Sequence, residues 1–186
     1  MIAYHGSIVS GLTELKPFAN PDSNLDFPCV YLTTLRPLAA FYIWNKPYKW
    51  MNFGFTPEGQ PVYVESFPGA LADFYGGVQG SIYACDGAFE QNPGTKVPTA
   101  VISQGAVRVA DEIIIPDALE LLLGLERSGD IRIARYHEMG DAMREKQRNM
   151  VVSLIRERRS WAAGEPMDLF LRERFSGLCG EVAKGC

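Results

Sequence analysis

The chain has 186 residues and a mass of 20.6 kDa, with 47% hydrophobic and 22% charged residues. These fractions are ordinary for a globular protein and exclude wholesale disorder, and the length allows a real core without disulfide or metal staples. The formal net charge of −4 argues against a general nucleic-acid binder, because such binding depends on neutralising phosphates.

The first half of the chain is predicted to be rich in β-strands. Short hydrophobic runs alternate with turn clusters at 20–24, 56–59 and 92–95, which is typical of strands joined by turns. The expected strands are 2–4, 30–33, 62–65, 81–85, 107–109 and 112–115. Two helices are expected between them, one at 37–44, where Pro37 suits the first helical position, and one at 69–75.

The second half changes character after Pro116. Asp117 is the expected N-cap of a helix at 118–127, with Gly129 near its end, and a strand is expected at 131–136. A last helix is expected at 167–179, after a longer helix at 141–159 whose apolar stripe comprises Met143, Gln147, Met150, Val151, Leu154 and Ile155. Strands followed by helices predict an α+β fold, with a body at 1–123 and a helical C-terminal appendage at 124–186 packed on it.

Charge is unevenly distributed along the chain. Residues 1–142 carry 9 Lys and Arg against 16 Asp and Glu, whereas residues 143–186 carry 9 against 6. This basic segment favours a solvated helix that docks partly through charge, with a local site for a polyanion as the alternative.

The sequence offers little for metal, disulfide or membrane chemistry. The two histidines and the absence of a Cys-x-x-Cys pair make a tetrahedral zinc site hard to build from the four cysteines, which are Cys29, Cys85, Cys179 and Cys186. The first residues lack a basic region followed by an apolar run, and no apolar stretch approaches the length of a membrane span. We therefore expect a cytoplasmic protein with no bound metal and no membrane partner.

Three short segments carry the candidate chemistry. The first is Tyr4-His5-Gly6-Ser7, at the end of the first predicted strand. The second begins with Tyr31 in the next predicted strand and leads into a helix containing Ala39-Ala40-Phe41-Tyr42, and the third is Asp111-Glu112-Ile113-Ile114-Ile115. Each segment alone is compatible with a turn histidine, a core tyrosine or a solvated strand end, so their order along the chain is the specific signal.

In this order the segments resemble the ADP-ribosyltransferase superfamily, in its His-Tyr-Glu branch that includes diphtheria toxin and the poly-ADP-ribose polymerases. The resemblance covers roughly residues 2–123 and extends to small uncharacterised bacterial members. It implies a split, mostly antiparallel sheet with NAD, the substrate, between its halves. It also implies cleavage of the bond between nicotinamide and ribose, with transfer of ADP-ribose to a protein, nucleic-acid or small-molecule acceptor.

The resemblance also implies roles for single residues. Glu112, His5 and Tyr31 are the expected catalytic residues, and His5, Gly6, Ser7, Tyr31 and Tyr42 are expected to bind NAD. Cleavage builds positive charge on the ribose, which the Glu112 carboxylate would stabilise. His5 would bond the adenosine-side ribose and the main chain of Gly6 the nicotinamide amide, where glycine lets a ligand approach closely. Tyr31 and Tyr42 would enclose the nicotinamide ring by stacking.

The sequence departs from the family pattern at two positions. Ala39 stands where the polymerases carry a serine that holds the nicotinamide amide, and loss of this contact predicts weaker nicotinamide binding. Ala110 stands where enzymes that modify Arg or Asn carry Gln or Glu, which disfavours that acceptor class. Glu65 is the rival carboxylate, but it follows the second segment too closely to match the third.

Three alternatives stay open at this point. The chain could be an RNA 2′-phosphotransferase-like enzyme, an NAD glycohydrolase that uses water as the acceptor, or a non-catalytic nucleotide-binding module of the same fold. A separate aromatic group, formed by Trp44, Tyr48, Trp50, Phe53 and Phe55, is expected to pack a loop onto the core, with stacking on a base as the alternative.

Overall fold

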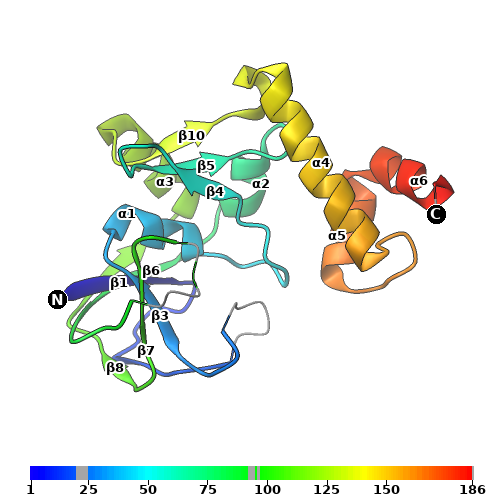
Figure 1. The fold of residues 1–186 in the computed structure, drawn as a ribbon. Helices are drawn as coiled ribbons and strands as arrows, with labels where there is room; N and C mark the ends of the chain where they lie inside the picture. The colour runs from blue at the N-terminus through cyan, green and yellow to red at the C-terminus, as the bar shows by residue number, and fades with distance from the viewer. Residues whose placement is uncertain (20–24, 92–94, 96, 186) are drawn as a thin grey trace. The chain divides into compact units, whose positions relative to one another are not determined.

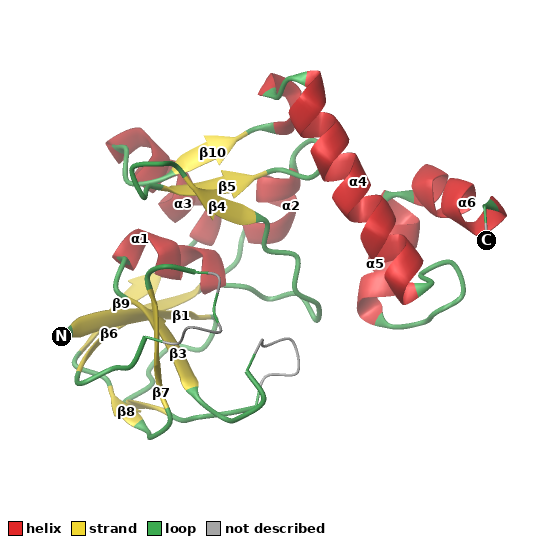
Figure 2. Ribbon diagram, in the orientation of Figure 1, coloured by secondary structure: helices red, strands yellow, loops and turns green. Residues whose placement is uncertain are grey.

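The computed structural model describes residues 1–19, 25–91, 95 and 97–185 (Figures 1 and 2). The turn cluster predicted at 20–24 and most of the one at 92–95 lie outside the described residues. The chain forms two compact units: unit 1 comprises Met1–Asn45, Phe53–Tyr63 and Leu71–Ile133, and unit 2 comprises Lys46–Asn52, Val64–Ala70 and Ala134–Cys186. Strands and helices mix as the sequence predicts, so the protein is α+β with mostly antiparallel pairing.

Unit 1 is organised around a five-stranded sheet of order β7-β3-β1-β6-β9. These strands are β1 (Ile2–Ser7), β3 (Val30–Thr33), β6 (Gly80–Asp86), β7 (Ala100–Ser103) and β9 (Asp111–Ile115). All four pairings in the sheet are antiparallel, and β1 pairs with β6 at six consecutive positions. This long pairing extends β1 beyond its predicted end at Tyr4, so that His5, Gly6 and Ser7 belong to the strand and do not follow it.

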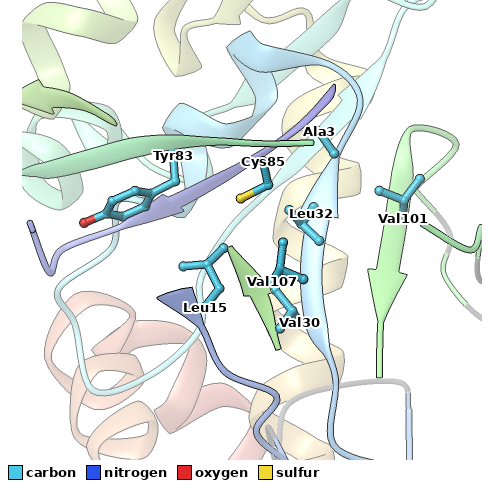
Figure 3. Close-up of a cluster of buried hydrophobic side chains, with 8 residues drawn as sticks. All are labelled: Ala3, Leu15, Val30, Leu32, Tyr83, Cys85, Val101 and Val107. Atoms are coloured by element: carbon cyan, nitrogen blue, oxygen red, sulfur yellow. The ribbon is translucent and has the colours of Figure 1, made fainter. Parts of the chain in front are cut away.

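The two faces of this sheet are covered differently. Ala3 and His5 project from one face of β1, and Tyr4 and Gly6 project from the other, because side chains alternate along a strand. The face that carries Ala3 packs into a hydrophobic cluster, made up of Ala3, Leu15, Val30, Leu32, Tyr83, Cys85, Val101 and Val107 (Figure 3). A short two-stranded sheet, β2 (Glu14–Leu15) with β8 (Val107–Arg108), contributes Leu15 and Val107 to this core.

Three helical segments of unit 1 follow local sequence signals. α1 (Arg36–Ala39) has Pro37 in its first turn and continues as the 3-10 helix η1 (Ala40–Tyr42), which ends two residues before the predicted end at residue 44. α2 spans Ala70–Tyr75. α3 (Ala118–Ser128) is capped by Asp117, which accepts hydrogen bonds from two main-chain N–H groups, and ends at Gly129 in the left-handed conformation that glycine tolerates, both as predicted.

A second sheet has the order β10-β5-β4. Its strands are β4 (Phe53–Phe55), β5 (Pro61–Val64) and β10 (Arg132–Ala134). The sequence predicts β5 and a longer version of β10, but not β2, β4 or β7. β2 has only two residues and β4 three, too few for an alternating pattern, and β7 follows closely on Pro93, Gly94 and Pro98, which indicate a turn or loop.

Unit 2 contains the 3-10 helix η2 (Tyr136–Glu138) and the helices α4 (Asp141–Arg158), α5 (Pro166–Arg174) and α6 (Ser176–Lys184). The single helix predicted at 167–179 is wrong, because the chain leaves helical geometry at Phe175 and begins a new helix. The predicted stripe of α4 is buried at Gln147, Val151 and Ile155 but exposed at Met143 and Met150.

The two units differ in charge. The residues of unit 1 include 6 Lys and Arg against 13 Asp and Glu, and those of unit 2 include 12 against 9.

The last boundary between the units falls after Ile133, so that α3 belongs to unit 1. Two earlier segments of the chain, Lys46–Asn52 and Val64–Ala70, belong to unit 2.

Candidate active site

The sheet of unit 1 is poorly paired between β1, its central strand, and the neighbouring strand β3. β1 and β3 are paired at one position, Tyr4 with Thr33, although all residues of both strands are described. Immediately beyond this pair, His5 Nδ1 lies 2.8 Å from the main-chain oxygen of Tyr31. Because a carbonyl oxygen only accepts, Nδ1 carries the proton, and the other ring nitrogen of neutral His5 is an acceptor.

The environment of His5 keeps it neutral. Burial lowers the pKa of the imidazole, and the hydrogen bond to the Tyr31 oxygen opposes this shift only in part. At neutral pH His5 therefore offers an unprotonated Nε2, which suits a hydrogen bond from a sugar hydroxyl.

Gly6 lies against the helix that follows β3. A Cβ atom at Gly6 would collide with the main-chain oxygen of Ala39 and would lie 3.3 Å from Cβ of Tyr42. The resemblance implies that this glycine lets a ligand approach, but the space beside its Cα is occupied by α1 and η1. Close packing of helix on strand is thus sufficient to require glycine at this position.

Tyr31 and Tyr42 lie on the Gly6 face of the sheet. The pairing of Tyr4 with Thr33 puts Thr33 and Tyr31 on the same face as Tyr4 and Gly6. Burial is the main cause, and the proximity of Tyr31 a smaller one, that raises the pKa of Tyr42 to about 12, so Tyr42 is a neutral phenol at physiological pH. Whether their rings enclose a nicotinamide stays a prediction.

Glu112 lies on the opposite face, in one row with His5. Register pairs His5 of β1 with Tyr83 of β6, and Tyr83 with Glu112 of β9. Directly paired residues project from the same face, so His5, Tyr83 and Glu112 form a row across three strands, with about 10 Å between the outer two main chains.

One oxygen of the Glu112 carboxylate is held by three donors. Oε1 lies 2.6 Å from Oγ of Ser81, 2.8 Å from the main-chain nitrogen of Gly11 and 3.0 Å from the hydroxyl oxygen of Tyr83. The hydrogen bond from Ser81 is the main cause that lowers the pKa of Glu112, followed by that from Gly11. Glu112 is therefore an anion at neutral pH, and among the described residues Oε2 has no hydrogen-bond partner.

Ser81, Tyr83 and Gly11 carry no motif that the sequence analysis could detect. Ser81 and Tyr83 are alternate residues of β6 and therefore share the Glu112 face, but only the register of β6 with β9 shows this. Ser7, predicted to bind NAD, accepts a hydrogen bond from the main-chain nitrogen of Val9 at 3.1 Å, and its contact with NAD stays a prediction.

The rival carboxylate Glu65 has a structural environment. It is buried in unit 2, where Oε2 accepts a hydrogen bond from the main-chain nitrogen of Tyr136 at 3.0 Å, whereas His5, Tyr31 and Glu112 all belong to unit 1. This arrangement supports the choice of Glu112 over Glu65.

The predicted aromatic group divides between the units. In unit 1, Trp44 packs on Phe74 and Tyr75, and Phe53 packs on Phe41. In unit 2, Tyr48 and Trp50 pack on Phe170 at centroid distances of 4.9 and 5.0 Å. These rings are thus engaged in the two cores, in agreement with the packing interpretation.

Each unit also has a surface cavity that is not lined by the candidate residues. In unit 1, a cavity of about 380 Å³ is lined by Tyr4, Arg36, Ile82, Asp86, Asp111 and Ile113, among others. In unit 2, one of about 500 Å³ includes Arg144, Arg148 and Arg174 in its wall, with Asp141 and Glu145 beside them. Two of these arginines are paired with acids, since Arg144 bonds Asp141 and Arg148 bonds Glu181, and Arg174 lies over the ring of Phe67.

Cysteine and metal chemistry are not evident in the part of the chain that the structure describes. Cys29, Cys85 and Cys179 are buried free thiols whose pKa values are raised by burial. No group of three or more His, Cys, Asp and Glu side chains comes together there as a metal site. Nor does any described helix combine the length and the apolar character needed to cross a bilayer.

Compared with known protein families, with curated proteins and with solved structures, the chain matches none. The candidate site therefore depends on the motifs and on the geometry described above.

Proposed function

We propose that this protein is an NAD-dependent ADP-ribosyltransferase of the His-Tyr-Glu type, built on the split sheet of unit 1. The observation that carries the proposal is the meeting of the three motifs on one sheet. His5 bonds the main chain of Tyr31 where β1 and β3 lose their pairing, and Glu112 lies in the row of His5 two strands away. Segments separated by up to 107 positions in the chain thus come together in one sheet, which supports the proposal.

The chemistry assigned to Glu112 agrees with its environment. In the proposed reaction the bond between C1′ of ribose and the nicotinamide nitrogen breaks, and nicotinamide leaves with the bonding electrons. A nucleophilic atom of the acceptor then bonds C1′ and gives up its proton. The sugar becomes positively charged before it is attacked, and a fixed carboxylate beside it lowers the energy of that state. Glu112 is ionised and its Oε1 is held in place, which are the properties this role requires.

The candidate residues lie on both faces of the sheet, which suggests that different parts of the ligand bind on different faces. Gly6, Tyr31 and Tyr42 lie on one face, and His5 and Glu112 on the other. A dinucleotide that contacts both groups would have to reach both faces of the sheet. In this pose the nicotinamide would lie toward the tyrosines, and a ribose hydroxyl would donate to Nε2 of His5.

Release of nicotinamide from NAD by the purified full chain tests the proposal. We expect release by the wild type and its loss in His5→Ala and Glu112→Gln. Glu65→Gln is the matched control, because it makes the same change at the rival carboxylate and should leave release unchanged. Equal release by the wild type and Glu112→Gln would refute the assignment of the site.

A non-catalytic NAD-binding module is the second candidate, and Ala39 is the observation that favours it. Ala39 is fully buried and replaces the serine that the family uses to hold nicotinamide. This candidate predicts that NAD raises the melting temperature without release of nicotinamide. Release that yields free ADP-ribose would instead indicate NAD hydrolysis, with water as the acceptor.

A further inference from the structure

We infer that Ser81 and Tyr83 are positioning residues for Glu112, which fix its carboxylate through Oε1 and leave Oε2 for the substrate. This inference rests on the proposed function, because it assigns the carboxylate a reacting partner. It adds two residues that are not part of the His-Tyr-Glu pattern and that only the strand register brings to the site.

The geometry of the sheet provides the support. Tyr83 is directly opposite Glu112 in the pairing of β6 with β9, and Ser81 is two residues along β6 on the same face. Both side chains are fully buried, so their hydroxyls cannot turn away to solvent. Their oxygens lie 3.0 and 2.6 Å from Oε1, within the range of hydrogen bonds to a charged acceptor.

The hydrogen-bond distances rank Ser81 and Tyr83 as donors to Glu112. The Tyr83 hydroxyl has a single proton but two acceptors, the main-chain oxygen of Val9 at 2.7 Å and Oε1 of Glu112 at 3.0 Å. Ser81 also has one proton and two acceptors, Oε1 of Glu112 at 2.6 Å and Oγ of Ser10 at 2.8 Å, but its shorter bond goes to the anionic carboxylate, which is the stronger acceptor. Ser81 therefore donates mainly to Glu112, whereas the shorter bond of Tyr83 goes to Val9.

Tyr83 also links Glu112 to the segment after β1. Its hydroxyl accepts a hydrogen bond from the main-chain nitrogen of Leu12 at 3.2 Å, and the nitrogen of Gly11 donates to Oε1 of Glu112. The aromatic ring lies in the hydrophobic cluster with its hydroxyl directed away from the other labelled side chains (Figure 3). The core thus fixes the tyrosine, and the tyrosine fixes both the carboxylate and residues 9–12.

These contacts predict different effects for the two hydroxyls. Removing the Ser81 hydroxyl takes the main stabilising donor from the anionic form of Glu112. Removing the Tyr83 hydroxyl takes a shared donor from Glu112 and also leaves the Leu12 nitrogen and the Val9 oxygen without this partner. We expect Ser81→Ala to act mainly on Glu112, and Tyr83→Phe to act on Glu112 and on stability together.

The test measures nicotinamide release as a function of NAD concentration and pH for Ser81→Ala and Tyr83→Phe. Each variant should lower kcat about tenfold, with KM for NAD within about twofold of the wild type, because only the transition state needs the oriented anion. The acid limb of the pH profile should move to higher pH. In the described strands the titratable side chains near Glu112 are Tyr83 in β6, Asp111 in β9 and, farther along the row, His5. Residues 8–12 contain no titratable side chain.

Tyr75→Phe is the matched control for Tyr83→Phe. Tyr75 is also fully buried in unit 1, and its hydroxyl donates to the main-chain oxygen of Phe41 at 3.0 Å, but it has no contact with Glu112. We expect Tyr75→Phe to lower the melting temperature about as much as Tyr83→Phe does, but to leave kcat and the pH profile unchanged. This result would show that Tyr83→Phe acts on kcat by releasing Glu112 and not by lowering stability. Ser66→Ala provides the same control for a buried serine, because Ser66 accepts a hydrogen bond from Trp50 in unit 2.

A carboxyl NMR titration of Glu112 gives a readout that does not need activity. The inference predicts that the pKa of Glu112 rises in Ser81→Ala and does not change in Ser66→Ala. An unchanged pKa, or kcat at the wild-type level in Ser81→Ala and Tyr83→Phe while Glu112→Gln is inactive, would overturn the positioning role alone. An inactive wild type with no response to NAD would instead overturn the proposed function and, with it, the reacting role of Oε2.

Discussion

His5 and Tyr31 are joined by a hydrogen bond between a side chain and a main chain, from Nδ1 to the Tyr31 oxygen at 2.8 Å. The bond spans 26 positions in sequence and lies next to the single pair, Tyr4 with Thr33, that connects β1 to β3. It therefore fixes the imidazole beside the single pair between the central strand β1 and its neighbour β3, and it selects the tautomer with an unprotonated Nε2.

The buried neutral state of His5 predicts a pH dependence of stability. Burial lowers the pKa of folded His5 below the ordinary value of 6.5, so at a pH between the two values the unfolded chain binds more protons. The contribution of His5 to stability is therefore complete above about pH 7 and is lost as the pH falls through 6.5 toward the lowered pKa.

Urea unfolding at several pH values checks this expectation. His5→Asn keeps an N–H donor for the Tyr31 oxygen but does not titrate, so the loss of stability between about pH 7 and 5 should be smaller than in the wild type. His137→Asn is the control, since it makes the same exchange at an exposed histidine. Identical profiles for the wild type and His5→Asn would contradict the buried neutral state.

Gly6→Ala should destabilise the protein by about 3 kcal/mol, because the new methyl group would collide with the main-chain oxygen of Ala39 and helix α1 would have to move. Gly124 is an interior residue of α3, and a Cβ there would meet only the end of the Arg127 side chain. Gly124→Ala should therefore stabilise the protein by about 0.5–1 kcal/mol. Denaturant unfolding of both variants measures the difference. A Gly6→Ala protein as stable as the wild type would show that α1 does not pack on β1 as described.

Asp117→Ala should cost about 1–2 kcal/mol. The Asp117 carboxylate caps α3 through the main-chain nitrogens of Leu119 and Glu120, and its second oxygen accepts a hydrogen bond from Gly77 at 3.1 Å. Asp117→Asn retains an acceptor at the cap and should recover most of the loss in a thermal unfolding experiment. Equal losses in the two variants would mean that charge, and not capping, is what α3 needs.

Asp168 is predicted to be essential for the helices of unit 2. It is 1% exposed, and its carboxylate accepts two hydrogen bonds from Arg158, at 2.8 and 3.2 Å, and one from Ser160 at 2.9 Å. Asp168→Ala would leave a partly buried guanidinium without its partner and should cost about 3 kcal/mol. Asp141→Ala removes the fully exposed partner of Arg144 and should cost about 0.5 kcal/mol or less.

The hydrogen bonds of Asp168 also predict that unit 2 loses stability at low pH. The hydrogen bonds from Arg158 are the main cause that lowers the pKa of Asp168 below its ordinary value of 3.8. The stabilisation is therefore complete above about pH 4 and lost as the pH falls through the lowered pKa. Helical circular dichroism during acid titration should show this loss in the wild type and a much smaller one in Asp168→Ala.

Local signals in the sequence were sufficient for most of the secondary structure. The strands β1, β3, β6 and β9 and the helices α2, α3 and α4 are confirmed within a few residues, because each depends on hydrophobic periodicity, caps or turn residues that lie close together in the chain. The misassigned elements lack such signals: β2 and β4 are too short to alternate, and the break between α5 and α6 at Phe175 has no glycine or proline to mark it.

For the candidate site, the sequence by itself determined the residue types and their order: His5, Tyr31, Tyr42 and Glu112. Tertiary structure alone decided that Ser81 and Tyr83 donate to Glu112, that Gly6 packs on Ala39, and that the tyrosines and His5 project from opposite faces. The physical reason is that these relationships depend on strand register, in which a shift of one residue would turn every side chain to the other face. Register is fixed by hydrogen bonds and packing between segments far apart in the chain, and no local pattern in the sequence records it.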